Sequence, residues 1–398
     1  MSSVSSKLTT VGVVFGSRSV EHDVSIVTAQ QVMQAMRPEK YEVVPIYITR
    51  QGHWITGPGL RDLKNFQSEN IAELMGMKET LISPDPKHHG LILSPVSGLF
   101  GRSQAKRLDV VFPALHGSHG EDGTLQGLLE LADIPYVGAG VMASAIVRDK
   151  IMLKALASHY GIPVVDHLGF SRHDWVNDPE ATLKRIESEL GYPVFVKPAS
   201  LGSSIGVARA NNAEEARNYI NIAANFDRRI VVEKALQDAI EINCALLGNE
   251  DIRASVLEQP ITWQEFLTYE EKYMRGEGAA GMKGAERKIP APISEELTRR
   301  IQQMAIDIFK AVDGRGTARV DFLVREAAGE VYLNEINTMP GSLAFYLWQE
   351  TGMSPQQVVD ELIRLAFDAH AEKRKTIYDY KTGLIAHAAA RGLKGLKK

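Results

Sequence analysis

The start of the chain contains two apolar runs with a segment between them in which apolar residues recur at helical spacing. Residues 8–17 contain a β-branched apolar run that ends in glycine, which predicts a buried strand, and residues 41–49 repeat this pattern. Between them, apolar side chains recur at helical spacing over residues 24–36. A strand, a helix and a strand in this order predict a βαβ unit at the start of a parallel sheet.

The pattern changes twice further along the chain. A polar stretch broken by glycine and proline, residues 57–106, leads into an apolar strand at 108–115. Later strands are predicted at residues 192–200, 229–236 and 241–248, and an amphipathic helix at 293–312. The changes near residues 140 and 228 divide this α/β chain into three predicted units, 1–140, 141–228 and 229–398.

Composition narrows the class of protein. With 398 residues, 44% hydrophobic and 24% charged, the chain is long enough for roughly two or three domains. The net charge of −4 gives no field that favours nucleic acid or an anionic membrane, so small-molecule substrates are expected. Cys244 is the single cysteine, which excludes an intramolecular disulfide and indicates a reducing compartment. The first ten residues lack a secretory signal, and apolar runs are too short to span a bilayer, so a cytoplasmic location is expected.

A predicted hairpin carries the strongest candidate chemistry. If its turn centres on Ala328, Asp321 faces Glu335 and Arg319 faces Asn337, all on one face with paired Cβ atoms about 5 Å apart. Two carboxylates and an amide oxygen this close suit a hard cation, such as Mg2+ on a nucleotide. A one-residue bulge in the hairpin would break this register. The alternative is a solvated sheet face with ordinary charge pairs.

A loop of small residues forms the second candidate site. A strand delivers Lys197, Pro198 ends the strand, and Ser-Leu-Gly-Ser-Ser-Ile-Gly follows, in which backbone N–H groups can approach an anion closely. The lysine precedes the glycines, so this is not a Walker A loop, and no GxGxxG follows the first strand. Taken alone, this loop is a weak signal, because a plain turn can have the same composition. Together with the hairpin it predicts a nucleotide site.

Two further loops of the N-terminal unit carry charged side chains. Glu21 and Asp23 lie near a predicted helix start, where acids commonly act as caps, an interpretation that suits Asp23 better than Glu21. His116 lies in a glycine-rich loop that also holds His119, Glu121 and Asp122. The loop is either a metal cluster or, more commonly, a hydrogen-bonded turn. At the C-terminal end of a strand, His116 can instead contact a substrate carboxylate.

Together these motifs carry a family resemblance. The segments GSRSVEHDVS, LHGSHGEDGTLQG, KPASLGSSIG, EEKY, RVDF and LNEINTMPG occur in order, and the chain from about residue 11 to 365 resembles the D-alanine–D-alanine ligase family of the ATP-grasp superfamily. The resemblance implies a Rossmann-like, parallel-sheet domain for the first substrate in residues 1–140. An ATP lid in 141–228 and a metal and acceptor subdomain in 229–398 would form the ATP grasp that encloses the nucleotide.

The resemblance also assigns roles to individual residues. Glu21 would hold the ammonium group of the first D-alanine, linked through Ser203 to Tyr273. Arg319 and the Gly341 N–H would stabilise the tetrahedral oxyanion. The nucleotide phosphates would be bound by Lys150, Lys197, Ser204 and, from a mobile loop, Lys272. Adenine would be read by backbone groups of Glu233, Lys234, Ala235 and Leu236, and ribose by Glu241, which lies one residue later than the usual spacing. Two Mg2+ ions, or Mn2+ in their place, would be bound by Asp321, Glu335 and Asn337.

The implied reaction joins two D-alanines for peptidoglycan precursor synthesis. The first D-alanine would attack the γ-phosphate of ATP to give an acyl phosphate, and the amine of the second would displace phosphate; a homodimer is expected. The alternatives are a ligase with D-serine, D-lactate or another acceptor, and a nucleotide-binding regulator without catalysis. The Lys272-Tyr273 pair favours dipeptide formation over D-lactate, and the complete set of charged site residues disfavours the regulator.

The segment after Gly341 departs from the family pattern. A Thr-containing turn and a serine usually follow and bind the carboxylate of the second amino acid, whereas here the sequence continues Ser-Leu-Ala-Phe-Tyr-Leu-Trp. Ser342 or Tyr346 is expected to take the role of that serine, unless the acceptor differs. The apolar residues of the segment, Leu343, Phe345 and Leu347, are predicted to be the core of a following helix.

Overall fold

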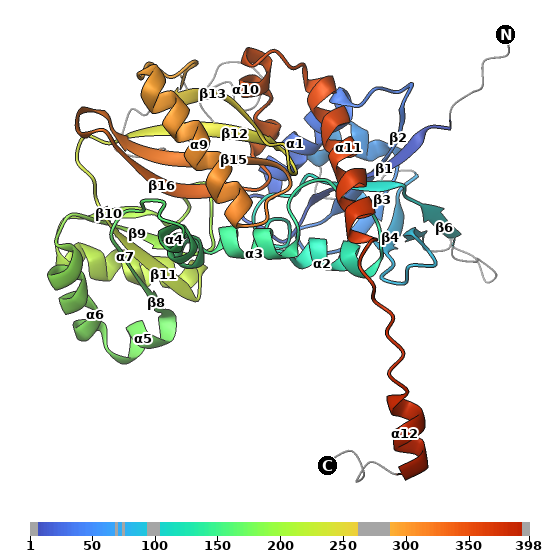
Figure 1. The fold of residues 1–398 in the computed structure, drawn as a ribbon, viewed down its shortest axis with the longest axis horizontal. Coiled ribbons are helices and arrows are strands. Elements are labelled where there is room, and N and C mark those ends of the chain that lie inside the picture. Colours follow the sequence, from blue (N-terminus) through green and yellow to red (C-terminus); the bar gives the residue numbers. More distant parts are fainter. Residues whose placement is uncertain (1–6, 68–70, 74–75, 94–103, 262–286, 392–398) are drawn as a thin grey trace.

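Three sheets follow one another along the chain. The computed structural model describes residues 7–67, 71–73, 76–93, 104–261 and 287–391. Figure 1 shows the N-terminal sheet on the right, a four-stranded sheet at the lower left and a five-stranded sheet above it. This mixture of a parallel-strand sheet, antiparallel sheets and covering helices confirms the predicted α/β class.

The N-terminal sheet has seven strands in the order β6-β5-β4-β3-β2-β1-β7. Its parallel strands are β1 (Thr9–Gly16), β2 (Tyr41–Ile48) and β7 (Val110–Pro113). β1 lies between the other two and is buried almost throughout, as expected for a strand covered on both faces. The antiparallel strands are β3 (Trp54–Thr56), β4 (Lys78–Ile82), β5 (Gly90–Leu93) and β6 (Gln104–Arg107). The sheet therefore continues into the polar stretch, where the sequence predicted no strand.

Helices from both ends of the chain cover this sheet. The elements are α1 (His22–Ala35), α2 (Thr124–Leu131) and α11 (Pro355–Lys373), with short 3-10 turns η1 (Pro58–Arg61), η2 (Leu63–Gln67) and η3 (Ile71–Glu73). Phe15 of β1 shares a core with Val32 of α1 and Leu362 of α11. Val14, on the opposite face, shares another with Leu129 of α2. The C-terminal helix thus completes the N-terminal core.

The four-stranded sheet is antiparallel, in the order β10-β9-β11-β8. Its strands are β8 (His167–Ser171), β9 (Val194–Pro198), β10 (Ala208–Ala210) and β11 (Arg229–Lys234), and its helices are α5 (Arg172–Asn177), α6 (Pro179–Arg185), η4 (Ile186–Leu190) and α7 (Ala213–Phe226). Two helices, α3 (Val141–Arg148) and α4 (Lys150–His159), precede it. Because β11 pairs with β8 and β9, we propose that the second unit ends after Lys234 rather than at residue 228.

The five-stranded sheet has the order β14-β13-β12-β15-β16. Its strands are β12 (Ile240–Gly248), β13 (Arg253–Pro260), β14 (Arg287–Lys288), β15 (Gly316–Arg325) and β16 (Glu330–Asn337), and η5 (Glu326–Ala328) joins the last two. α9 (Glu295–Ala311) lies across it in Figure 1. Ser294 caps α9, and apolar residues at helical spacing, Leu297, Ile301, Ala305 and Ile308, pack its inner face onto the sheet.

The chain after β16 first returns to the core and then leaves it. It forms η6 (Gly341–Ala344) and α10 (Phe345–Glu350) before α11. Leu343, Phe345 and Leu347 are buried, which confirms that they are core residues. Beyond α11, α12 (Leu384–Arg391) projects from the body in Figure 1. Among the described residues, every helix is too short or too polar to span a bilayer.

Candidate active site

The β15–β16 hairpin places the predicted metal side chains in register. Asp321 pairs with Glu335, and Arg319 pairs with Asn337, which confirms the predicted pairs. Asn243 of β12 lies opposite Asp321 on the other side, so the polar row crosses three strands. Since side chains alternate along each strand, these groups share one face of the sheet.

The hairpin has this register because of a shorter turn and a bulge, neither of which was predicted. A turn centred on Ala328 would place Arg325 opposite Val331, but Arg325 pairs with Glu330. Nearer the site the register shifts by one residue, at a bulge formed by Asn334. The prediction of the turn centre was therefore wrong, and the bulge, which was expected to break the register, instead offsets the shorter turn.

Asp321 is the most strongly held of the metal candidates. Arg319 donates from Nε and Nη2 to its two carboxylate oxygens at 2.7 Å each, and Asn337 Nδ2 donates to Oδ2 at 3.0 Å. The carboxyl is 1% exposed, and burial raises its pKa to about 6, with Glu241 and Glu335 adding to the rise and Arg319 opposing it. Excess negative charge in a buried site favours a cation.

The donor set fits a hard divalent cation such as Mg2+. Asp321 and Glu335 supply carboxylate oxygens, and Asn337 supplies an amide oxygen, because its Nδ2 is the atom that donates to Asp321. Within the described ranges, no three His, Cys, Asp or Glu side chains gather to hold a metal. In the loop around His116, Glu121 and Asp122 instead accept hydrogen bonds from the N–H groups of Gly117 and His119, which favours the hydrogen-bonded turn over the metal cluster. The hairpin offers three metal ligands only when the amide oxygen of Asn337 is counted.

Lys150 connects the hairpin to the loop after β9. Asp149 caps α4 by accepting from the N–H groups of Ile151 and Met152 at 3.0 and 3.1 Å, which makes Lys150 the first helical residue. The Lys150 ammonium lies 3.2 Å from Glu335 Oε2 and donates to the Leu201 carbonyl at 2.7 Å. This lysine therefore stands between a metal candidate and the small-residue loop, as a phosphate-binding lysine would.

A cleft of about 330 Å³ separates the four-stranded sheet from the five-stranded sheet. Its lining includes the predicted metal ligand Glu335 and the predicted nucleotide-binding residues Lys150, Lys197, Ser204, Glu233, Lys234, Leu236 and Glu241. Apolar side chains such as Val207, Ile240 and Leu323 line it as well. A cleft with apolar walls and lysines at one end suits a base and its phosphates.

Hydrogen bonds at the end of β11 restrict which backbone groups can contact a base. The Lys234 N–H donates to the Asp166 carbonyl at 2.9 Å, and the Ala235 N–H donates to the Pro193 carbonyl at 3.0 Å. These two donors are occupied within the protein, so a base would be read by carbonyl oxygens and by the Leu236 N–H. The Glu233 side chain is engaged too, because its Oε2 accepts from Lys197 Nζ at 2.7 Å.

Glu21 lies at the centre of a buried polar group. It precedes α1 but makes no capping hydrogen bond with its side chain; instead it accepts from the Ser203 hydroxyl and lies 3.4 Å from Arg148 Nη2. Ser203 has a positive φ of 55°, which is strained for a residue with a side chain and typical of functional loops. A Cβ on Gly117 would lie 2.5 Å from Glu21 Oε2, so glycine there allows the close approach.

Glu121 and His116 border the same group. Glu121 accepts from the N–H groups of Gly117 at 2.7 Å and Met339 at 3.2 Å, and lies 3.6 Å from Arg148. Burial raises the pKa of Glu121 to about 7, with Arg148 opposing the rise. His116 Nε2 lies 2.8 Å from Thr28 Oγ1, and burial lowers the pKa of His116 to about 4, which keeps it neutral at pH 7. With two carboxylates facing one guanidinium, this group suits an ammonium ion.

The two halves of the site meet in one small hollow. Its lining includes Glu121 and Arg148 from the polar group around Glu21, and Lys150, Glu335 and Asn337 from the phosphate and metal side. A small substrate bound at Glu21 would therefore have its other end beside the predicted metal ligands.

The segment after Gly341 turns through an unusual backbone. Ser342, Leu343 and Ala344 all have positive φ values near 50°, a costly left-handed turn for residues with side chains. The Ser342 N–H donates to Thr28 Oγ1 at 3.3 Å, while its buried hydroxyl has no hydrogen-bond partner among the described residues. The Tyr346 hydroxyl, by contrast, donates to Glu258. Ser342 is thus the better candidate for the role of the family's serine.

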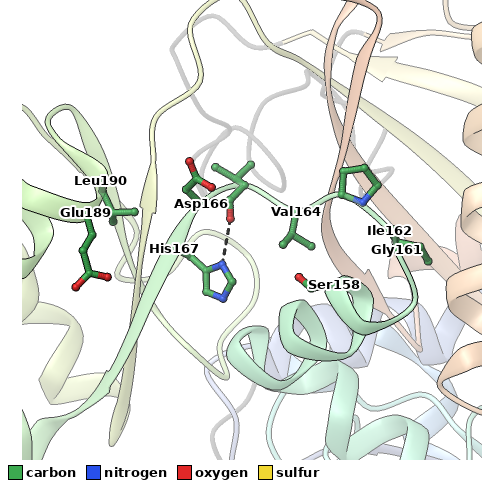
Figure 2. A pocket seen from close by; sticks show the side chains of 10 residues that line it. Ser158, Gly161, Ile162, Val164, Asp166, His167, Glu189 and Leu190 are labelled. Atoms are coloured by element: carbon green, nitrogen blue, oxygen red, sulfur yellow. Dashed lines mark hydrogen bonds between the residues drawn. The ribbon is translucent and has the colours of Figure 1, made fainter.

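A second hollow lies beside the segment that joins α4 to β8, away from the predicted site residues. It has a volume of about 570 Å³ and is lined by the segment from Gly161 to His167 together with Ser158, Glu189 and Leu190. His167 Nδ1 lies 3.1 Å from the Val165 carbonyl oxygen, and Figure 2 marks this contact by a dashed line from the His167 ring. None of the predicted site residues lines it.

Three charged site residues were not predicted, and two predicted ones cannot be placed. Lys154 was recognisable four residues after Lys150, on the same helix face. Glu121 was considered only within the metal-cluster alternative, and Arg148 gave no signal beyond its position two residues before Lys150. Lys272 and Tyr273 lie outside the described residues.

The raised pKa of Glu121 predicts a pH-dependent stability. The folded state holds this proton up to about pH 7, whereas the unfolded chain releases it near 4.5, so the stability from Glu121 is lost as pH rises between these values. Glu121→Gln removes the charge and keeps one of the two acceptor oxygens; the loss of the other acceptor does not depend on pH. We expect the melting temperature of Glu121→Gln relative to wild type to rise by about 5 °C from pH 5 to pH 8. Thermal unfolding at several pH values measures this; a constant difference would contradict it, and the exposed Glu296→Gln serves as the control.

Comparison with known proteins identifies relatives of the whole chain. A family model described as D-ala D-ala ligase N-terminus matches residues 10–139, and one described as D-ala D-ala ligase C-terminus matches residues 156–364. The chain is 41% identical over 372 residues to the D-alanine–D-alanine ligase of Bacillus cytotoxicus, covering 92% of this chain and 98% of that one. It is 40% identical to the Thermosipho africanus enzyme of the same name, covering 94% and 98%.

Two solved structures are similar in fold to this chain over nearly its whole length. The D-alanine–D-alanine ligase from Coxiella burnetii superposes with a TM-score of 0.76 at 30% identity, covering 97% of this chain and 99% of that one. The VanG D-Ala:D-Ser ligase from Enterococcus faecalis superposes with a TM-score of 0.76 at 31% identity, covering 90% and 100%.

Proposed function

Because the chain belongs to the D-alanine–D-alanine ligase family, we propose that it joins two D-alanines in an ATP-dependent reaction that supplies peptidoglycan synthesis. The observation that carries the proposal is the shared hollow, in which Arg148 beside Glu21 meets Lys150, Glu335 and Asn337. A binding protein for nucleotide alone would not need a second polar group at the phosphate end of its cleft.

The first step requires an activated carboxylate. Glu21 binds the ammonium group of the first D-alanine, whose carboxylate then points toward the phosphates. One of its oxygens attacks the γ-phosphorus, the bond to the β,γ-bridging oxygen breaks, and ADP leaves. Lys150 and Lys197 neutralise charge on the phosphates. Asp321, Glu335 and Asn337 would hold Mg2+, which would supply further neutralisation.

The second step forms the peptide bond. The amine of the second D-alanine attacks the acyl carbon, and phosphate departs with its bridging oxygen. Negative charge develops on the carbonyl oxygen, where the Arg319 guanidinium and the Gly341 N–H stabilise it. The buried Ser342 hydroxyl, which has no partner within the described part of the chain, binds the acceptor carboxylate.

Other parts of the proposal rest on the family resemblance. They comprise two Mg2+ ions with Mn2+ as a substitute, a homodimer, a cytoplasmic location, ribose binding by Glu241, and contacts of Lys272 and Tyr273 with phosphate and with Ser203. Adenine recognition by β11 is proposed with the Leu236 N–H as its donor, since the two preceding N–H groups are occupied.

An acceptor panel tests the function. The full chain is incubated with ATP, Mg2+ and D-alanine, alone or with D-serine or D-lactate, and phosphate release and product mass are measured. We expect D-alanyl-D-alanine as the main product and phosphate release that depends on D-alanine. D-serine is included because VanG, a D-Ala:D-Ser ligase, has a similar fold. A preference for D-serine or D-lactate would change the acceptor, and no phosphate release would favour a regulator.

A further inference from the structure

Lys154 is a buried lysine that the proposed mechanism does not use. Its side chain is fully buried in α4, one turn after Lys150, and it does not line the nucleotide cleft. Its ammonium lies 3.1 Å from Glu233 Oε1. Burial lowers the pKa of Lys154, and Glu233 opposes this shift. A charged group without solvent is retained at a cost, so its presence calls for a specific role.

Glu233 serves two lysines with one carboxylate. Oε1 faces Lys154, while Oε2 accepts from Lys197 Nζ at 2.7 Å, and the Glu233 side chain is 3% exposed. Burial alone would raise the pKa of Glu233, but the two lysines outweigh it and lower the pKa to about 2. The carboxylate therefore stays ionised inside the protein.

Only one of the two lysines can reach a nucleotide. Lys197 lines the cleft and is 12% exposed, and Asn334 Oδ1 lies 3.4 Å away as a second partner. Turning Lys197 toward a phosphate takes its charge away from Glu233. Removing one partner of a buried ion pair is strongly destabilising unless another cation remains beside the uncompensated charge.

We propose that Lys154 is a positioning residue, the permanent counter-ion of Glu233, which allows Lys197 to leave Glu233 and bind the nucleotide phosphates. This inference rests on the proposed ATP site. Lys150 is arranged differently, because the side chain of its partner Glu335 is 18% exposed and can itself meet a cation from the cleft. Glu233 also borders the cleft, but its side chain is only 3% exposed and its Oε1 faces Lys154, so the counter-ion of this oxygen comes from α4.

The test measures nucleotide binding rather than turnover. In Lys154→Met, Lys197 becomes the single counter-ion of Glu233, so the dissociation constant for Mg-ADP, measured by titration calorimetry, is expected to rise about 10- to 100-fold. Lys154→Arg, which keeps the charge, is expected to recover most of the affinity. The exposed Lys184→Met is the matched control and should bind Mg-ADP as wild type does. A folded Lys154→Met with unchanged affinity would overturn the proposal.

A double variant separates this role from mere packing and from failure to fold. Glu233→Gln removes the charge that needs a counter-ion, so Glu233→Gln and Lys154→Met/Glu233→Gln should bind Mg-ADP within about threefold of each other. A further loss of tenfold or more in the double variant would show that Lys154 acts without Glu233, and would overturn the proposal. If D-alanine-dependent turnover is absent in wild type while the Mg-ADP results hold, the proposed function fails and the role of Lys154 stands.

Discussion

Glu335→Ala is expected to lower D-alanine-dependent ADP release about 1,000-fold. The side chain has two roles in the site: it lies opposite Asp321 as a predicted metal ligand, and its Oε2 is 3.2 Å from the Lys150 ammonium. Its removal takes away a ligand and leaves Lys150 held by the Leu201 carbonyl alone among its named contacts. A coupled assay of ADP measures the loss, and Lys150→Ala is expected to give a similar one.

The matched control lies on the same strand. Glu330 is at the far end of β16, where it pairs with Arg325 at the surface, 2.8 Å away. Surface ion pairs contribute little, so Glu330→Ala should keep activity within about twofold of wild type. Full activity in Glu335→Ala, or an equal loss in Glu330→Ala, would remove the hairpin from the catalytic site.

The hairpin also shows which parts of the site could be predicted from the sequence and which could not. Alternation of side chains was enough to put Asp321 and Glu335 on one face, because that rule depends only on local backbone geometry. The turn centre was wrong because turn length depends on which residues adopt left-handed conformations, here Gly329 with φ +64°. The bulge at Asn334 leaves no trace in the apolar pattern, so the correct pairs came from two deviations that cancel.

Residues with roles defined by distant contacts were the ones missed. Arg148 belongs to the site because it meets Glu21, which is 127 positions away in sequence. Glu121 has a raised pKa because folding buries it, and no sequence pattern reports burial of a loop carboxylate. Lys154 is the exception, since helical spacing from Lys150 placed both lysines on one face of α4. Sequence periodicity thus predicts elements and faces, whereas the charge balance of a site needs the tertiary structure.

Arg319→Lys is expected to separate the two chemical steps. Arg319 holds Asp321 through two parallel hydrogen bonds of 2.7 Å, a geometry that a lysine ammonium cannot reproduce. We propose that this guanidinium stabilises the oxyanion of the second step, so peptide formation should slow about 100-fold. Acyl phosphate formation should be less affected, and water can then compete with the second D-alanine for the acyl group.

The measured quantity is the ratio of ADP released to dipeptide formed, which should rise in Arg319→Lys. Wild type should release one ADP for each D-alanyl-D-alanine, whereas Arg319→Lys should release several, as quantified by a coupled ADP assay alongside product mass analysis. Arg325→Lys is the control, since Arg325 lies on the same strand and pairs with Glu330 at the surface. If Arg319→Lys slows ADP and dipeptide formation equally, Arg319 acts in the first step, through its hold on Asp321. Only a variant that makes ADP faster than dipeptide places the guanidinium at the oxyanion.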